Sequence, residues 1–158
     1  MKRALLIFAF IALTEVADAQ DYRSVQTSGI FWSARGERSF ELYVVAKPFS
    51  AKRHGKIKHF WGGDDPAFKP RSVASSFRLT VDGVPINIPA SAIADMGDIA
   101  LPDAPYGRGD GADFALEWGG GDAAGTYRCT FFFSGTKLIR REVFGYLAKE
   151  PSEVKNFK

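Results

Sequence analysis

Residues 113–147, DFALEWGGGDAAGTYRCTFFFSGTKLIRREVFGYL, decide the expected fold. On both sides of the glycine-rich turn 119–125, apolar side chains occupy every second position: Phe114, Leu116, Trp118, Tyr127, Cys129, Phe131 and Phe133. This alternation is typical of strands with one buried face. The dipeptide Ser134-Gly135 then turns the chain into a third strand, from Leu138 to Leu147. We therefore predict an antiparallel sheet here, against which the rest of the chain packs.

The last of these strands has an ambiguous register. A tight turn at Ser134-Gly135 places Leu138 and Arg140 on the same face as Cys129, whereas Val143 favours the opposite parity. A β-bulge near residues 140–141 reconciles the two patterns, because one extra residue reverses the face of everything that follows it.

Residues 76–88 predict a β-hairpin. Asp82-Gly83 is a two-residue turn of the kind that requires positive φ, the type I′ turn. Pro85, which has no N–H to donate, falls opposite Thr80 and indicates that residues 84–88 form an edge strand. In this register three apolar pairs share one face: Val81 with Val84, Leu79 with Ile86, and Phe77 with Ile88.

Shorter signals complete the expected architecture. We predict strands at 30–33 and 40–47, a weak strand at 56–61, and one helical turn at 92–96 capped by Ser91. The resulting class is all-β, a single antiparallel β-sandwich or squat barrel of about seven or eight short strands. The expected boundaries are an extended lead-in at 20–29, a β domain at 30–148 and a polar, frayed tail at 149–158.

The N-terminus has the pattern of a cleaved signal peptide at residues 1–19. Lys2 and Arg3 precede the apolar run 4–13, and Ala17-Asp18-Ala19 fits the small-residue rule for cleavage before Gln20. No other stretch of the sequence is long and apolar enough for a transmembrane anchor. We therefore expect an exported protein, either periplasmic or secreted from a bacterium.

The single cysteine, Cys129, excludes an intramolecular disulfide. Its strand parity places it on the apolar face, where cysteine behaves as a small hydrophobic residue. We therefore predict that Cys129 is buried. An exported chain without an internal disulfide fits a bacterial periplasm better than a eukaryotic secretory route.

Catalytic and metal-binding patterns are weak. The chain lacks the G-x-S-x-G and H-E-x-x-H motifs, so we predict no catalytic residues. His54 and His59 lie near Asp64 and Asp65, but the surrounding lysines and arginines repel a cation. The acidic turn 110–113 lacks the ligand spacing of a calcium loop. We expect neither a metal nor a cofactor.

A basic run is the candidate functional surface. Four fixed positive charges lie between positions 52 and 58, in a chain whose net charge of +3 is too low for a dedicated nucleic-acid binder. Clustered cations beside an aromatic residue favour polyanions such as lipid headgroups, acidic glycans or nucleic acid. We predict a non-enzymatic site for an anionic surface, glycan or protein partner, formed by Lys52, Arg53, His54, Lys56, Lys58, His59 and Trp61.

Three alternatives stay open. In the first, the basic run has no binding role and is a solvated loop that protects a neighbouring strand edge. In the second, the protein carries a small apolar ligand inside a closed barrel. In the third, it is an enzyme without a recognisable motif. The carrier requires an internal cavity and fails if the rings of Phe77, Phe114, Phe131 and Phe133, with Leu79, fill the interior. The predicted edge strand 84–88 is a second surface for a partner that adds a strand, although Pro85 argues against it.

Overall fold

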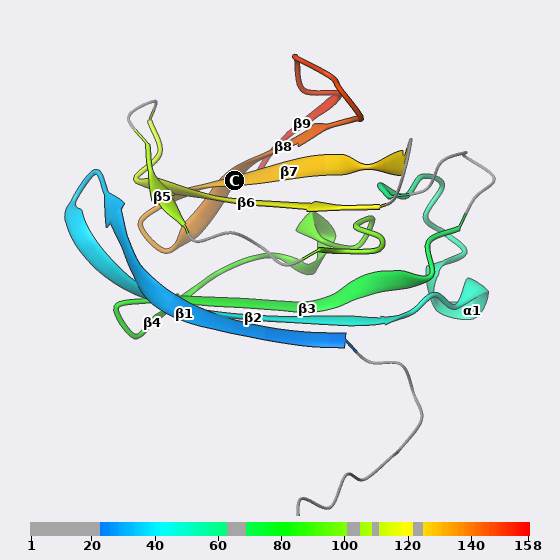
Figure 1. Cartoon of the computed structure of the whole chain (residues 1–158), viewed down its shortest axis with the longest axis horizontal. Coiled ribbons are helices and arrows are strands. Elements are labelled where there is room, and N and C mark those ends of the chain that lie inside the picture. Colours follow the sequence, from blue (N-terminus) through cyan, green and yellow to red (C-terminus); the bar gives the residue numbers. More distant parts are fainter. Residues whose placement is uncertain (1–22, 63–68, 101–104, 109–110, 122–124) are drawn as a thin grey trace, which may run out of the picture.

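The fold consists of two antiparallel β-sheets of four and five strands that face each other (Figure 1). The structure is a computed structural model, and it describes residues 23–62, 69–100, 105–108, 111–121 and 125–158. The strand orders are β1-β2-β3-β4 and β5-β6-β7-β8-β9, so each sheet follows the order of the chain. The predicted all-β class is confirmed.

The first sheet contains β1 (Arg23–Ser33), β2 (Gly36–Pro48), β3 (Ser72–Val81) and β4 (Val84–Ile86). A one-turn helix, α1 (Ala51–His54), lies in the connection from β2 to β3, and a 3₁₀ turn, η1 (Ala90–Ala92), follows β4. The second sheet contains β5 (Tyr106–Gly107), β6 (Phe114–Gly120), β7 (Tyr127–Ser134), β8 (Lys137–Phe144) and β9 (Glu153–Asn156).

The core lies between the two sheets and is rich in aromatic rings. The Phe31 ring lies 5.3 Å from that of Phe114, and the Phe77 ring lies 5.0 Å from that of Trp118, so both pairs join one sheet to the other. The residues of β6 and β7 that the alternation assigns to the inner face are all buried, and Cys129 is completely buried. The opposite face is not simply exposed, because Ala115 and Phe132 are buried there in a second, smaller apolar cluster. Burial of the aromatic faces supplies most of the driving force for this layered arrangement.

The β3–β4 hairpin forms in the predicted register. Asp82 and Gly83 have φ values of 49° and 73°, and Thr80 is opposite Pro85. The Ser39 N–H and the Arg38 side chain both donate to the Asp82 carboxylate, which lowers the pKa of Asp82 and ties the turn to β2. β4 is an edge strand as predicted, but it ends at Ile86.

Both ends of the domain are more regular than the sequence indicates. The predicted lead-in 20–29 is strand from Arg23 onward, because the long β2 strand offers a partner as far as the pair Arg23–Ala46. The predicted frayed tail is wrong: β9 pairs with β8 from Arg140–Asn156 to Val143–Glu153. Both segments are polar because one of their faces meets solvent, and this polarity resembles that of a loop.

A bulge in β8 occurs one residue before the predicted position. Leu138 is opposite Phe133 and Arg140 is opposite Phe132, so Ile139 is the additional residue. The bulge reverses the parity of the strand and turns Arg141 inward, where only 1% of its surface is exposed.

Two smaller predictions are wrong. The turn after β4 is the 3₁₀ segment η1, preceded by Pro89 and without a side-chain cap, so Ser91 does not begin a helix at 92–96. The weak strand predicted at 56–61 reduces to one bridge between Trp61 and Met96. Asp110, the first residue of the acidic turn 110–113, lies outside the described residues.

Candidate functional site

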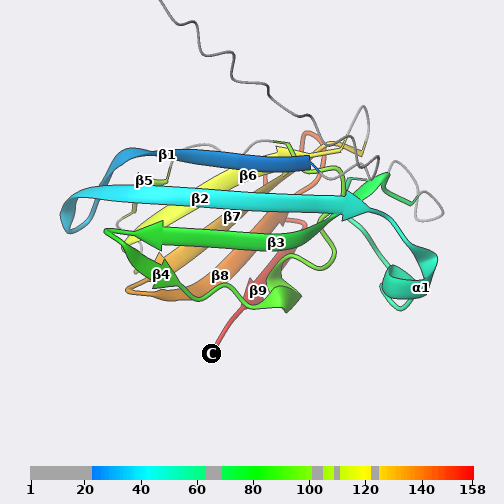
Figure 2. The same ribbon diagram turned by 90° about the horizontal axis from the view of Figure 1, so that it is seen from below.

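The predicted basic residues lie at one end of the first sheet, in the connection that leaves β2 and returns as β3 (Figure 2). We call residues 47–62 together with 69–71 the basic loop. It carries seven fixed positive charges and, in these described residues, no carboxylate; the cations are Lys47, Lys52, Arg53, Lys56, Lys58, Lys69 and Arg71. Asp64 and Asp65 lie outside the described residues.

Phe49 organises the basic loop. Pro48 ends β2, and the Phe49 N–H then donates to the carbonyl of Arg71 at 2.9 Å, which holds the two sides of the loop together. The Phe49 ring lies 5.6 Å from that of Phe60 in an edge-to-face contact and 5.4 Å from the His54 ring. The Lys69 ammonium lies 5.7 Å from the centre of the same ring, a distance that permits a cation–π attraction.

Trp61 anchors the other side of the loop to the core. The backbone N–H of Trp61 donates to the backbone carbonyl of Asp95, and the backbone carbonyl of Trp61 accepts from the N–H of Gly97, both at 2.9 Å. The half-buried indole packs against the core and lies 6.4 Å from the Tyr127 ring. Trp61 therefore helps to fix the position of the loop. The sequence alone does not indicate this role.

Six of the seven cations of the loop are exposed, and Lys47 is half-buried. Lys52, Arg53, Lys56 and Lys58 are exposed, and so is His59, whereas His54 is half-buried. The predicted charges at 52–58 are thus exposed, whereas the prediction does not include Phe49 and Lys69, which contact each other at the base of the loop. The structure has the arrangement that multivalent anion binding needs, since several exposed cations project from a packed aromatic base.

His54 is neutral in this arrangement. The Ser50 N–H donates to Nδ1 of His54 at 2.9 Å, so Nδ1 carries no proton. Partial burial, helped by the adjacent Arg53, lowers the pKa of His54 below its usual value of 6.5. Because the unfolded chain binds the proton more readily, the stability that neutral His54 contributes is present above about pH 6.5 and is lost as the pH falls further.

Acidification is therefore expected to loosen the turn at residues 50–54 while the sheets stay intact. Protonation of His54 removes the acceptor of the Ser50 N–H. The protection of that amide against exchange, relative to its intrinsic rate at each pH, should therefore fall. A pH titration followed by amide NMR measures this effect. His54→Gln should abolish the transition and His59→Gln should keep it; a transition that survives His54→Gln would contradict this assignment.

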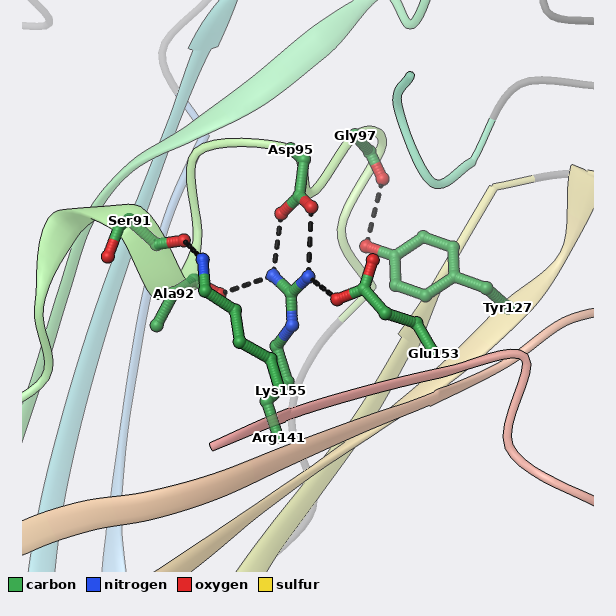
Figure 3. A network of polar contacts seen from close by, with 8 residues as sticks. All are labelled: Ser91, Ala92, Asp95, Gly97, Tyr127, Arg141, Glu153 and Lys155. Atoms are coloured by element: carbon green, nitrogen blue, oxygen red, sulfur yellow. Dashed lines mark hydrogen bonds and ion pairs between the residues drawn. The ribbon is translucent and has the colours of Figure 1, made fainter. Parts of the chain in front are cut away.

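A second polar cluster lies between the sheets, around the inward-facing Arg141 (Figure 3). Its guanidinium donates to both oxygens of Asp95, at 2.6 and 2.9 Å, and to the carbonyl of Ala92 at 2.9 Å. It also forms an ion pair with Glu153 of β9. Lys155 donates to the carbonyl of Ser91 at 2.9 Å and closes the cluster.

The Arg141 cluster is a cross-link between three segments. Burial alone would lower the pKa of Arg141, but the hydrogen bonds to Asp95 and Glu153 raise it above its usual value, so the side chain stays charged. One guanidinium thereby joins β8, the connection after η1 and β9. The two terminal nitrogens of its guanidinium donate to groups of the protein itself, so we assign Arg141 to stability rather than to ligand binding.

The described part of the chain contains no group of three or more His, Cys, Asp or Glu side chains that could hold a metal ion. In the same residues no helix has both the length and the hydropathy needed to cross a membrane. Comparison with protein-family models, with curated proteins and with solved structures finds no match for this chain. The geometry of the basic loop is therefore the basis on which a function is inferred.

Proposed function

We propose that the protein is an exported, non-enzymatic binding protein whose basic loop binds an anionic partner. One observation carries the proposal: seven cations gather at one end of the first sheet, without a carboxylate among the described residues of the loop. The facing sheets, which we take to be a β-sandwich, serve as the scaffold. Phe49 and Trp61 fix the loop to it.

The chemistry of the loop suits a partner with many negative charges. Most of its cations come from lysine, whose ammonium is a compact charge on a flexible stem and does not demand one ligand geometry. Each exposed contact contributes little and is screened by salt, so several must act together. An anionic lipid surface, an acidic glycan or an acidic protein surface meets this requirement.

Export is part of the same proposal. The basic n-region, the apolar run 4–13 and the small residues before Gln20 support a cleaved leader. The intact mass of the protein purified from its host tests this point, since cleavage before Gln20 removes residues 1–19. A mass that includes these residues would contradict it.

Removal of three loop lysines is expected to abolish most of the binding. At an anionic membrane each lysine near the surface contributes about 1 kcal/mol, so Lys52, Lys56 and Lys58 replaced together by alanine should weaken binding on the order of 100-fold. Co-sedimentation with phosphatidylglycerol vesicles, and retention on dextran sulfate and on immobilised polyglutamate, at low and high salt, measure the effect and rank the three classes of partner.

The matched control removes the same charge elsewhere. Lys137, Lys149 and Lys158 are exposed lysines of the second sheet and the C-terminal segment, and their replacement by alanine should leave most of the binding intact. Equal losses in the two triple variants would indicate a response to net charge alone. Binding that ignores salt, or that survives the loop substitutions, would refute the role of the basic loop.

The alternative of an apolar-ligand carrier has less support. Leu79 and the four phenylalanines at positions 77, 114, 131 and 133 are all buried. Phe131 lies 5.8 Å from Phe77 and 6.1 Å from Phe133, and Phe133 stacks on Phe114 at 4.8 Å. These rings occupy the space that a ligand would need.

A further inference from the structure

β1 is a long edge strand that carries no charge after its first residue, Arg23. It has eleven residues and pairs only with β2 in the first sheet. Residues 24–34 contain no charged side chain, although charged residues make up 25% of the whole chain. An edge with neither charge nor proline is an open template for another strand, because its outward N–H and C=O groups lack partners in the sheet.

The other edges of the two sheets have the features that prevent strand addition. β4 is three residues long and contains Pro85. β5 has only two residues. β9 is four residues long and carries Glu153 and Lys155. Short length, proline and charge all protect an edge, so β1 is the exception within the described part of this molecule.

The residues of β1 that face outward can be assigned. The two-residue turn Ala34-Arg35 closes on the pair Ser33–Gly36, so the odd-numbered residues exchange hydrogen bonds with β2. The even-numbered residues then direct their N–H and C=O groups away from β2. The position of Gly107 agrees, because a Cβ on this residue would lie 2.6 Å from the carbonyl oxygen of Trp32.

Large apolar side chains are exposed on the same residues. Ile30 is 64% exposed and Trp32 is 69% exposed, both on the outer face of the sheet. Ser24, Gln26 and Ser28 lie on that face as well, and all three are exposed. The edge therefore combines backbone groups that pair with no other described strand with an apolar surface beside them.

We propose that β1 binds the β1 strand of a second copy of this chain, antiparallel and about a two-fold axis at Ser28. In this register Ile30 is opposite Gln26 of the other copy and Trp32 is opposite Ser24, so each large side chain meets a smaller polar one. No like charges meet, because the strand has none between Ser24 and Ser33. Residues 26–30 alone would exchange about six backbone hydrogen bonds, two for each facing pair.

A self-complementary strand favours a second copy over a different partner. A two-fold contact uses the same surface on both subunits, so the outward backbone groups of residues 26–30 find their counterparts on an identical strand. The contact joins the two four-stranded sheets into one continuous sheet. β5 already covers the end of β1 near Ser33, where Gly107 lies against the backbone, and this limits the contact to the open part of the strand.

Charge substitution at the axis tests this proposal. Ser28→Lys and Ser28→Glu each place like charges opposite each other, and each variant should weaken self-association roughly tenfold or more. An equimolar mixture of the two should associate again as a heterodimer. Sedimentation velocity over a concentration series measures all three, and Thr136→Lys, which adds a charge at the exposed β7–β8 turn, should behave like the wild type.

A cross-link gives a second readout that does not depend on affinity. Directly opposed, hydrogen-bonded residues have Cα atoms about 5.5 Å apart, within the range that a disulfide spans. Ser28→Cys should therefore form a covalent dimer under mild oxidation, while the buried Cys129 stays reduced. A protein that is monomeric throughout the series, or a dimer that Ser28→Lys does not weaken, would overturn the proposal.

Discussion

Replacement of Phe131 by alanine is expected to destabilise the protein by about 4 kcal/mol, the largest effect of any single truncation in the core. Phe131 is completely buried at the centre of the aromatic layer. Its ring meets Trp118 edge-on at 4.3 Å and lies within 6.1 Å of both Phe77 and Phe133, so its loss leaves a cavity lined by rigid rings. The measurement is chemical denaturation of both proteins.

Two controls make the Phe131 experiment specific. Phe131→Leu keeps much of the volume and should cost about 1.5 kcal/mol or less. Val154→Ala changes a side chain that is 50% exposed on β9 and should have almost no effect. A loss below about 1 kcal/mol for Phe131→Ala, at an unchanged dependence on denaturant, would show that the two sheets do not share this aromatic core.

Replacement of Arg141 by methionine is expected to cost about 3 kcal/mol. The substitution keeps the length and apolar character of the stem but leaves the carboxylates of Asp95 and Glu153 without a cation, and breaking a buried pair costs about 3–5 kcal/mol. We expect the lower end of this range, because the two carboxyl side chains are 23% and 33% exposed and can be hydrated. Thermal and chemical denaturation measure the loss.

Simultaneous neutralisation of the cluster provides the control. Arg141→Met combined with Asp95→Asn and Glu153→Gln leaves no unpaired charge, and removal of a complete buried ion pair is often close to neutral. Loss of the guanidinium also removes Nε, which is buried without a hydrogen-bond partner in the described part of the chain. The triple variant should therefore recover most of the stability. If it is as unstable as Arg141→Met, then packing rather than charge accounts for the effect.

The strands that alternate strictly were predictable from the sequence. In β6 and β7 the local period of two identifies the residues that face the core, and in the β3–β4 hairpin the Asp82-Gly83 turn fixes the register independently of the rest of the fold. Local geometry and tertiary packing favour the same structure at these positions, and such agreement allows the structure to be predicted from the sequence.

The segments that were missed depend on distant partners. β9 pairs with β8 through residues that are polar on the exposed side, and Glu153 is held by Arg141, twelve positions away in the sequence. Arg141 itself reads as a surface residue until the bulge at Ile139 turns it inward. A short stretch of sequence specifies neither the extra residue Ile139 nor the partners of Arg141. The alternation of apolar residues therefore predicted the position of the bulge only approximately.

The candidate site shows the same division. Its exposed cations follow from the charge run at residues 52–58, since charge near the surface is visible in sequence. The aromatic base does not follow, because Phe49 and Lys69 stand on opposite sides of the loop and meet only when β2 and β3 pair. The sequence signal that could have indicated this aromatic base was Phe49, which directly follows Pro48 at the end of the predicted strand.

A dimer formed through β1 would leave the basic loops of both copies accessible. The basic loop begins at the end of β2, beside the first residues of β1, since Arg23 is paired with Ala46. Because the two copies of β1 would run antiparallel, their basic loops would lie at opposite ends of the joined sheet. Two linked sites raise the apparent affinity for an extended anionic surface, provided that its geometry allows both to bind.

The most direct test of the account is a residue-resolved titration of the labelled protein with short dextran sulfate chains, followed by amide NMR. We expect the largest shifts at residues 50–61 and 69–71, a salt-dependent response, and loss of these shifts when Lys52, Lys56 and Lys58 are alanine. Shifts of equal size over both sheets, or confined to segments outside the basic loop, would contradict the central claim that this loop is the anion-binding site.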